Sequence, residues 1–216
     1  MSTCSLRELV ALKRHYRFYL LVDEAHLNGA VSPNGKGACD YFGVNPRNVD
    51  ILMGIFGISF SASGGNIASS QDVITKLRTT NPGYNYGEAP VPAVMAQIIA
   101  SMKIILANGE GSGGGNTRLK QLLWNSRYLR QGLRRIGYTV YGNEDSPIVP
   151  ALLLNPAKTP VSSCEMLPWK ISVVVVAYPA TPLHCLECAE ALKRCTQRMT
   201  WTTYYLHVKS FVVCFR

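Results

Sequence analysis

The sequence predicts an α/β fold, because stretches with helical periodicity alternate with short apolar runs of strand length. Of the 216 residues, 47% are apolar and 16% are charged, a composition that suits a packed core and excludes intrinsic disorder. A glycine-rich stretch at 109–115 interrupts the alternation. We therefore expect two parts, residues 1–110 and residues 111–216.

The first part is expected to begin with a helix at 5–15 and to continue into a strand at 18–23. Apolar residues recur on one side of this helix, and we expect Ser5 to be its N-cap, with Glu8 three residues on. The strand, FYLLVD, is a continuous apolar run, which is typical of parallel strands buried on both faces. The remaining elements expected in this part are strands at 48–54 and 64–68 and helices at 69–78 and 92–108, the last of them begun by its proline.

The second part is expected to begin with a long helix at 117–137, which Gly137 ends. Three strands should follow it, at 138–142, 148–154 and 171–178. The last segment, 201–216, is rich in aromatic and β-branched residues but has no clear amphipathic pattern. No internal repeat is found.

Charge and cysteine content narrow the functional classes. The net charge is +9, but the cations are spread out, and we interpret the densest groups, 13–17 and 127–135, as solvated faces and not as a nucleic-acid surface. The seven scattered cysteines are expected to be reduced thiols. No apolar run reaches the roughly 18 residues of a membrane-spanning helix, and the first residues do not resemble a signal peptide. We therefore predict a cytoplasmic protein without a transmembrane segment or a nucleic-acid partner.

Three local motifs suggest chemistry that the surrounding sequence does not support. The DEAH tetrapeptide at 23–26 would need the phosphate loop of a helicase, and the sequence has none. The glycines at 109–114 match the dinucleotide-binding pattern but follow a helix instead of a strand, so we interpret them as a linker. A single Cys-x-x-Cys on an expected helical stretch is too little for a zinc site, so no metal is predicted. The residues considered as zinc ligands are His184, Cys185, Cys188 and Cys195.

The most informative residues lie at the end of the first strand and just after it. Asp23 ends a run that we expect to be buried, where α/β sheets present ligand-binding groups and where a carboxylate needs a positive partner. The protonated ring nitrogen of pyridoxal phosphate is one such partner, and His26 could hydrogen-bond the phenolic oxygen of the same ring. From these residues alone, the alternative that Asp23 caps a loop and His26 lies on the surface stays open.

Several longer stretches resemble one family. They are LLVDEAHLNGAVSPNGKGACDYFGVNPRNVDILMG, SFSASGGNIA, YGNEDSPIVPALLLNPAK and VVVVAYPATPL. Together they are similar, from about Leu9 to Leu183, to the later part of serine palmitoyltransferase catalytic subunits, which are α-oxoamine synthases of the fold-type I pyridoxal-phosphate enzymes. The resemblance implies a remnant of the large-domain sheet in residues 1–110 and a small α+β domain in residues 111–216, with the tail after residue 183 unmatched.

The resemblance also implies an activity and a location. Members of this family condense serine with palmitoyl-CoA to form 3-ketosphinganine, the first step of sphingolipid biosynthesis, and they work as dimers at the endoplasmic reticulum. By resemblance, Asp23 would bind the pyridinium nitrogen of the cofactor and His26 would lie beside it. An intact family subunit would be the dimer partner, and it would hold this chain at the cytosolic face of the endoplasmic reticulum.

The chain departs from the family at the position on which covalent catalysis depends. The family stretch resembles GTFTKSFGASGG, and its lysine forms the Schiff base with the cofactor, whereas residues 54–65 read GIFGISFSASGG with Ile58 in that position. Isoleucine has no amine, so it can neither form an imine nor transfer the substrate proton. Glu88 stands where the family has hydroxyls near a phosphate, and like charges would repel there. We therefore expect no catalytic residue and no covalent attachment of the cofactor.

Three interpretations are open at this point. The chain is a truncated, degenerate relative that is inactive alone, or an interaction subunit that docks on an intact family member through apolar faces such as that of helix 92–108. The third interpretation is the product of a decayed gene that does not fold stably.

Overall fold

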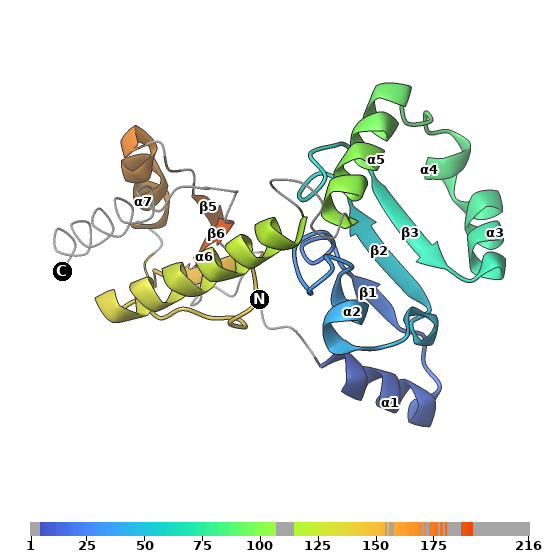
Figure 1. Cartoon of the computed structure of the whole chain (residues 1–216), viewed down its shortest axis with the longest axis horizontal. Coiled ribbons are helices and arrows are strands. Elements are labelled where there is room, and N and C mark those ends of the chain that lie inside the picture. Colours follow the sequence, from blue (N-terminus) through green and yellow to red (C-terminus); the bar gives the residue numbers. More distant parts are fainter. Residues whose placement is uncertain are drawn as a thin grey trace. The chain divides into compact units, whose positions relative to one another are not determined.

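The computed structural model describes residues 5–106, 115–153, 155, 158–169, 171, 173–176, 178, 180 and 187–191. They form two compact units, which we call the amino-terminal unit (Cys4–Lys120) and the carboxyl-terminal unit (Gln121–Arg216 with Met1–Thr3). The expected boundary at 110–111 and the aromatic segment 201–216 lie outside the described residues. Helices and strands alternate along the described chain, so the predicted α/β class is confirmed (Figure 1).

The amino-terminal unit contains a three-stranded sheet in the order β1-β2-β3 (Figure 1). Strand β1 (Leu21–Asp23) runs parallel to β2 (Ile51–Ile55), and β2 is antiparallel to β3 (Gly65–Ser69). All three strands lie where the sequence predicts them. The expected burial of β1 is wrong, because Leu21 is 57% exposed and the preceding Tyr19 is 90% exposed. Strand β1 pairs with β2 only, so its other edge has no strand among the described residues to cover it.

One face of this sheet carries the core of the unit. Val22 of β1 and Leu52 of β2, which are partners in the register, pack with buried residues of α1 (Leu6–Tyr16) and α2 (Ala38–Phe42). Because side chains alternate along a strand, the neighbouring residues point to the opposite face. We call that second face the open sheet face. Its apolar residues, all half-buried or exposed, are Leu21, Ile51, Met53, Ile55 and Ile67.

The helices of this unit agree in part with the prediction. Those expected at 5–15, 69–78 and 92–108 are present, whereas two short helices and a 3-10 turn were not predicted. Helix α5 has only two buried residues, Ile98 and Ile105, and the hydroxyl of its Ser101 donates to the Phe60 carbonyl at 2.9 Å. Besides α1 and α2, the helical elements are η1 (Pro46–Asn48), α3 (Gln71–Thr80), α4 (Pro82–Asn85) and α5 (Pro92–Leu106).

The carboxyl-terminal unit packs a helix against a second small sheet. Leu129 and Leu133 on α6 (Gly115–Ile136) form a core with Val149 and Val173. The three strands are all antiparallel and lie in the order β4-β6-β5. The elements after α6 are β4 (Ile148–Leu152), α7 (Lys158–Met166), η2 (Leu167–Trp169), β5 (Val174–Val176) and β6 (Glu187–Ala191).

Four expectations for this unit need correction. The strand expected at 138–142 is reduced to a single bridge between Val140 and Ala151, and the strand expected at 171–178 is the shorter β5. The stretch around Cys188, expected to be helical, is strand β6, because pairing with β4 and β5 overrides its local helix preference. The basic group at 127–135 is not a solvated face throughout, because Arg130 is fully buried.

Candidate functional site

The candidate site lies where the parallel strands β1 and β2 end. Asp23 is the last residue of β1, and Ile58 belongs to the connection between β2 and β3. The loops that follow the two strands touch: a Cβ added at Gly29 would lie 2.6 Å from the Cβ of Ser59. Gly29 also has a φ of +74°, so this close approach depends on a residue without a side chain. The fold therefore brings the loop after Asp23 against the immediate neighbour of Ile58.

Asp23 is exposed, which corrects the expectation that it is buried. Its Oδ1 accepts a hydrogen bond from the backbone N–H of Ala25 at 2.8 Å, so the side chain caps the start of the loop. Its second oxygen, Oδ2, has no hydrogen bond with a described residue and can accept one from a ligand. His26 lies half-buried in the same turn. The two predicted cofactor residues are thus on one short loop at the carboxyl end of the sheet.

Ile58 is 46% exposed, so the position that the sequence resemblance assigns to the nucleophilic lysine is accessible but has only an aliphatic side chain. The free oxygen of Asp23 fits the protonated ring nitrogen of pyridoxal phosphate, whereas position 58 does not fit covalent attachment. Glu88 lies exposed between α4 and α5. Its predicted closeness to a phosphate stays a prediction.

Glu24 lies in the same loop as Asp23 and His26, and its role was not predicted from the sequence. Its side chain is only 7% exposed, and its Oε1 accepts the N–H of Ala38 at 2.9 Å, at the start of α2. Its backbone N–H donates to the Met53 carbonyl on β2 at 2.7 Å. A Cβ at Gly37 would lie 2.9 Å from Oε2, so the glycine leaves room for the carboxylate. Glu24 therefore fastens the loop of Asp23 and His26 to both α2 and β2, through partners too distant in sequence to form a motif.

The surroundings of Glu24 shift the pKa of two groups. Burial raises the pKa of the Glu24 carboxyl, while hydrogen bonds from the backbone of Ala38 and Cys39 partly oppose this rise. Burial and the negative charge of Glu24 together raise the pKa of the Cys39 thiol to about 11. The Cys39 thiol is therefore protonated at neutral pH and is not a nucleophile here.

We expect Glu24→Gln to flatten the dependence of folding stability on pH. Because the pKa of Glu24 is higher in the folded than in the unfolded chain, the folded state binds the proton more tightly, and the free energy of unfolding falls as pH rises above the ordinary value of 4.5. The amide cannot ionise, so this decline should disappear. Urea unfolding at a series of pH values measures it, with Glu8→Gln at an exposed position of α1 as the control. An unchanged pH slope in Glu24→Gln would contradict the assignment.

The described part of the chain includes no group of three or more side chains that could hold a metal ion. Of the residues considered as zinc ligands, Cys188 is on β6, and His184, Cys185 and Cys195 lie outside the described residues. None of the helices described here is long and apolar enough to cross a bilayer.

The profile described as aminotransferase class I and II matches residues 1–196, which is most of the chain. The chain belongs to this family. The curated class I and II relatives include serine palmitoyltransferase 2 of Schizosaccharomyces pombe, 53% identical over 180 residues, which are 83% of this chain and 30% of the relative. Serine palmitoyltransferase 3 of Homo sapiens is 44% identical over 182 residues, 84% of this chain and 33% of the relative. The resemblance predicted from sequence motifs is confirmed, and the chain spans about a third of the length of these relatives.

Solved structures of the family share the fold. A serine palmitoyltransferase of Sphingomonas wittichii superposes with a TM-score of 0.85 at 25% identity, covering 97% of this chain and 51% of that chain. Another, described as serine palmitoyltransferase with pyridoxal phosphate, superposes with a TM-score of 0.86 at 23% identity, covering 97% of this chain and 51% of that one. The family fold predicted for the chain is confirmed, and pyridoxal phosphate is bound in structures of this aminotransferase family.

Proposed function

We propose that this chain is a non-catalytic relative of the serine palmitoyltransferase catalytic subunit, and that it associates with a full-length subunit instead of transferring the acyl group alone. The observation that carries the proposal is Ile58, an exposed aliphatic side chain in the position that the sequence resemblance assigns to the family's lysine. Both covalent attachment of the cofactor and movement of the substrate's α-proton need an amine there. The chain by itself is therefore expected to form no product from serine and palmitoyl-CoA.

The chain keeps residues that would hold the cofactor without a covalent bond. When bound, pyridoxal phosphate supplies an electron sink next to the substrate's α-carbon. Asp23 would accept the ring N–H through its open oxygen, and His26 would hydrogen-bond the phenolic oxygen. Glu24 would keep this loop in place through α2 and β2. The resulting affinity should be lower than in a family member with the lysine.

The open sheet face supports docking on another subunit. Leu21 and Ile67 on this face are 57% and 45% exposed, although apolar residues on both faces of a strand are typical of a sheet covered on both sides. This chain covers 51% of the Sphingomonas wittichii structure, so the fold of that relative contains about as much chain again. Substrates, and a location at the cytosolic face of the endoplasmic reticulum, would come through the full-length partner.

We expect the purified chain to form a complex with purified full-length serine palmitoyltransferase 2 of S. pombe, measured by size-exclusion chromatography with light scattering. Burying an aliphatic side chain contributes roughly 1.5–3 kcal/mol, so Leu21→Glu with Ile67→Glu should weaken binding at least about a hundredfold. The matched control is Leu167→Glu in the carboxyl-terminal unit, where the side chain is 67% exposed. A chain that stays separate from the partner, or that turns over both substrates alone, would contradict the proposal.

A further inference from the structure

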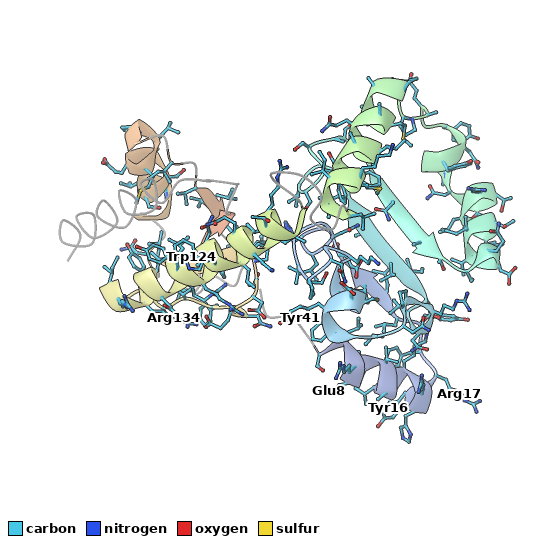
Figure 2. The ribbon with its side chains drawn as sticks, in the orientation of Figure 1. Glu8, Tyr16, Arg17, Tyr41, Trp124 and Arg134 are labelled. Carbon is cyan, nitrogen blue, oxygen red and sulfur yellow. The ribbon has the colours of Figure 1, made fainter. Side chains whose placement is uncertain are left out.

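A second exposed surface of the amino-terminal unit lies at the end of α1. Six consecutive residues, 14–19 with the sequence RHYRFY, are all exposed, Tyr16 by 68% and Tyr19 by 90%. Figure 2 shows Tyr16 and Arg17 at the end of this helix, pointing away from the rest of the unit. We call these six residues the exposed segment. Single exposed apolar side chains are common on protein surfaces, whereas three exposed aromatic rings within six residues are not.

Backbone hydrogen bonds and an ion pair fix the two ends of the exposed segment. Arg17 takes the left-handed conformation (φ 54°) that ends α1, and its backbone N–H donates to the Lys13 carbonyl at 2.8 Å. The Lys13 ammonium lies 2.7 Å from the Asp50 carboxylate, which also accepts the N–H of Leu20 at 2.7 Å. The segment is therefore anchored at Lys13 on one side and at the buried Leu20 on the other, while its six side chains stay outside.

The cations of the exposed segment have no counter-charge. Among the described residues, neither the Arg14 nor the Arg17 side chain makes an ion pair or a hydrogen bond. By contrast, the exposed Arg127 and Arg134 pair with Asp145 and Glu144, at 2.5 and 2.6 Å. Asp50, the carboxylate that holds Leu20 after this end of α1, is already bound by Lys13. The surface thus offers two unpaired guanidinium groups.

Exposed apolar side chains precede and follow these cations along the chain. Leu12 is 45% exposed and lies one helical turn before Tyr16, and Phe18 is 38% exposed between the two tyrosines. Tyrosine and phenylalanine beside arginine, on an end of the unit that points outward, match the residues that lie at the headgroup level of a membrane.

We infer that the exposed segment docks the chain on an anionic lipid surface. Arg14 and Arg17 bind the headgroup phosphates and carboxylates, while the three rings and Leu12 enter the interface between headgroups and acyl chains. Single-stranded nucleic acid is bound by similar residue types, but in a groove where rings stack on bases. The aliphatic Leu12 favours lipid over bases. This inference does not depend on the proposed association with another subunit.

Flotation of the full chain with vesicles tests the inference. The chain should float with vesicles of phosphatidylcholine mixed with phosphatidylserine, not with phosphatidylcholine alone, and binding should weaken as salt is raised. The double variant Arg14→Gln, Arg17→Gln should lower the partition coefficient about thirtyfold. Phe18→Ser with Tyr19→Ser should lower it as well, without changing net charge. The matched control, Lys76→Gln with Arg78→Gln on α3, removes the same charge and should bind like the natural chain.

Three results would overturn the inference. They are equal losses in the control and the Arg14/Arg17 variant, equal binding to both kinds of vesicle, or tighter binding to a single-stranded RNA oligomer than to anionic vesicles at the same salt. Far-UV circular dichroism of each variant shows that the helices are retained, so a loss of binding is not a loss of folding.

Discussion

Replacing Ile58 by lysine is expected to give a chain that binds pyridoxal phosphate covalently, whereas the natural chain binds none covalently at this position. Position 58 is 46% exposed, so a lysine can be placed there without burying its charge. The loop that carries Asp23 and His26 packs against the residue next to it, through Gly29 and Ser59. A lysine at 58 would therefore meet a cofactor already oriented by Asp23, and orientation of two reacting groups raises the yield of reaction strongly.

The matched control for this experiment is Ile67→Lys, because Ile67 is 45% exposed and lies on β3 of the same unit. Absorbance at about 420 nm, reduction with borohydride and peptide mass spectrometry measure and locate the adduct. At equal cofactor concentration, we expect at least about tenfold more reduced adduct at position 58 of Ile58→Lys than at position 67 of Ile67→Lys.

Two outcomes would contradict this account. Equal labelling of the two variants would show that the surroundings of position 58 do not orient the cofactor. A strong borohydride-sensitive band in the natural chain would show that another amine replaces the missing one, and the proposal of a non-catalytic chain would be wrong. Adding Asp23→Ala to Ile58→Lys should lower the adduct yield, since the pyridinium contact is then lost.

Long segments with a regular pattern were predictable from the sequence. Helices α1, α3 and α5, and strands β2 and β3, lie close to their expected ranges, because their periodicity and the proline that begins α5 are local signals. Ser5 is the N-cap of α1 as expected, but its side chain makes no capping hydrogen bond. Helix α2 has no such signal: it is five residues long and begins at Ala38, whose backbone N–H donates to the buried Glu24. Strand β6 has helix-forming residues and is a strand only because β4 and β5 pair with it.

The candidate site, too, could be predicted from the sequence only in part. The positions of Asp23 and His26 at the end of β1, and of Ile58 after β2, follow from the order of the elements and could be predicted. The burial of Asp23 could not, because a continuous apolar strand shows only that both faces can be covered, whereas in the described unit the open sheet face is only partly covered and Leu21, Asp23 and Ile67 stay exposed. Glu24 was missed because its partners come from α2 and β2 and not from neighbouring residues.

Arg130 in the carboxyl-terminal unit is a second case in which tertiary contacts outweigh a sequence pattern. The residue is fully buried, although it lies in a basic stretch of α6 whose other arginines are exposed. Its Nη1 donates to the Tyr141 carbonyl, and its Nη2 donates to the carbonyls of Ile148 at 3.0 Å and Ser146 at 3.4 Å. Burial lowers the pKa of the guanidinium, the charge of Glu144 opposes this shift, and nearby Arg134 adds to it. One side chain thus connects α6 to the whole segment that leads into β4.

Arg130→Met is expected to lower the free energy of unfolding by about 3–5 kcal/mol, because it removes a fully buried charged donor on which three carbonyls depend. Arg130→Lys should recover only part of this loss, since an ammonium cannot span carbonyls on both sides as a planar guanidinium does. Urea unfolding followed by circular dichroism measures both.

The control is Arg127→Met, one turn earlier on α6, where the side chain is 51% exposed and pairs with Asp145. An exposed ion pair of this kind contributes about 0–1 kcal/mol, so the two methionine variants should differ severalfold in their effect. The experiment also decides between the remaining interpretations. A chain that does not fold stably has no cooperative transition for Arg130→Met to shift, whereas a folded unit held by the buried guanidinium must show a transition that moves with this residue and not with Arg127.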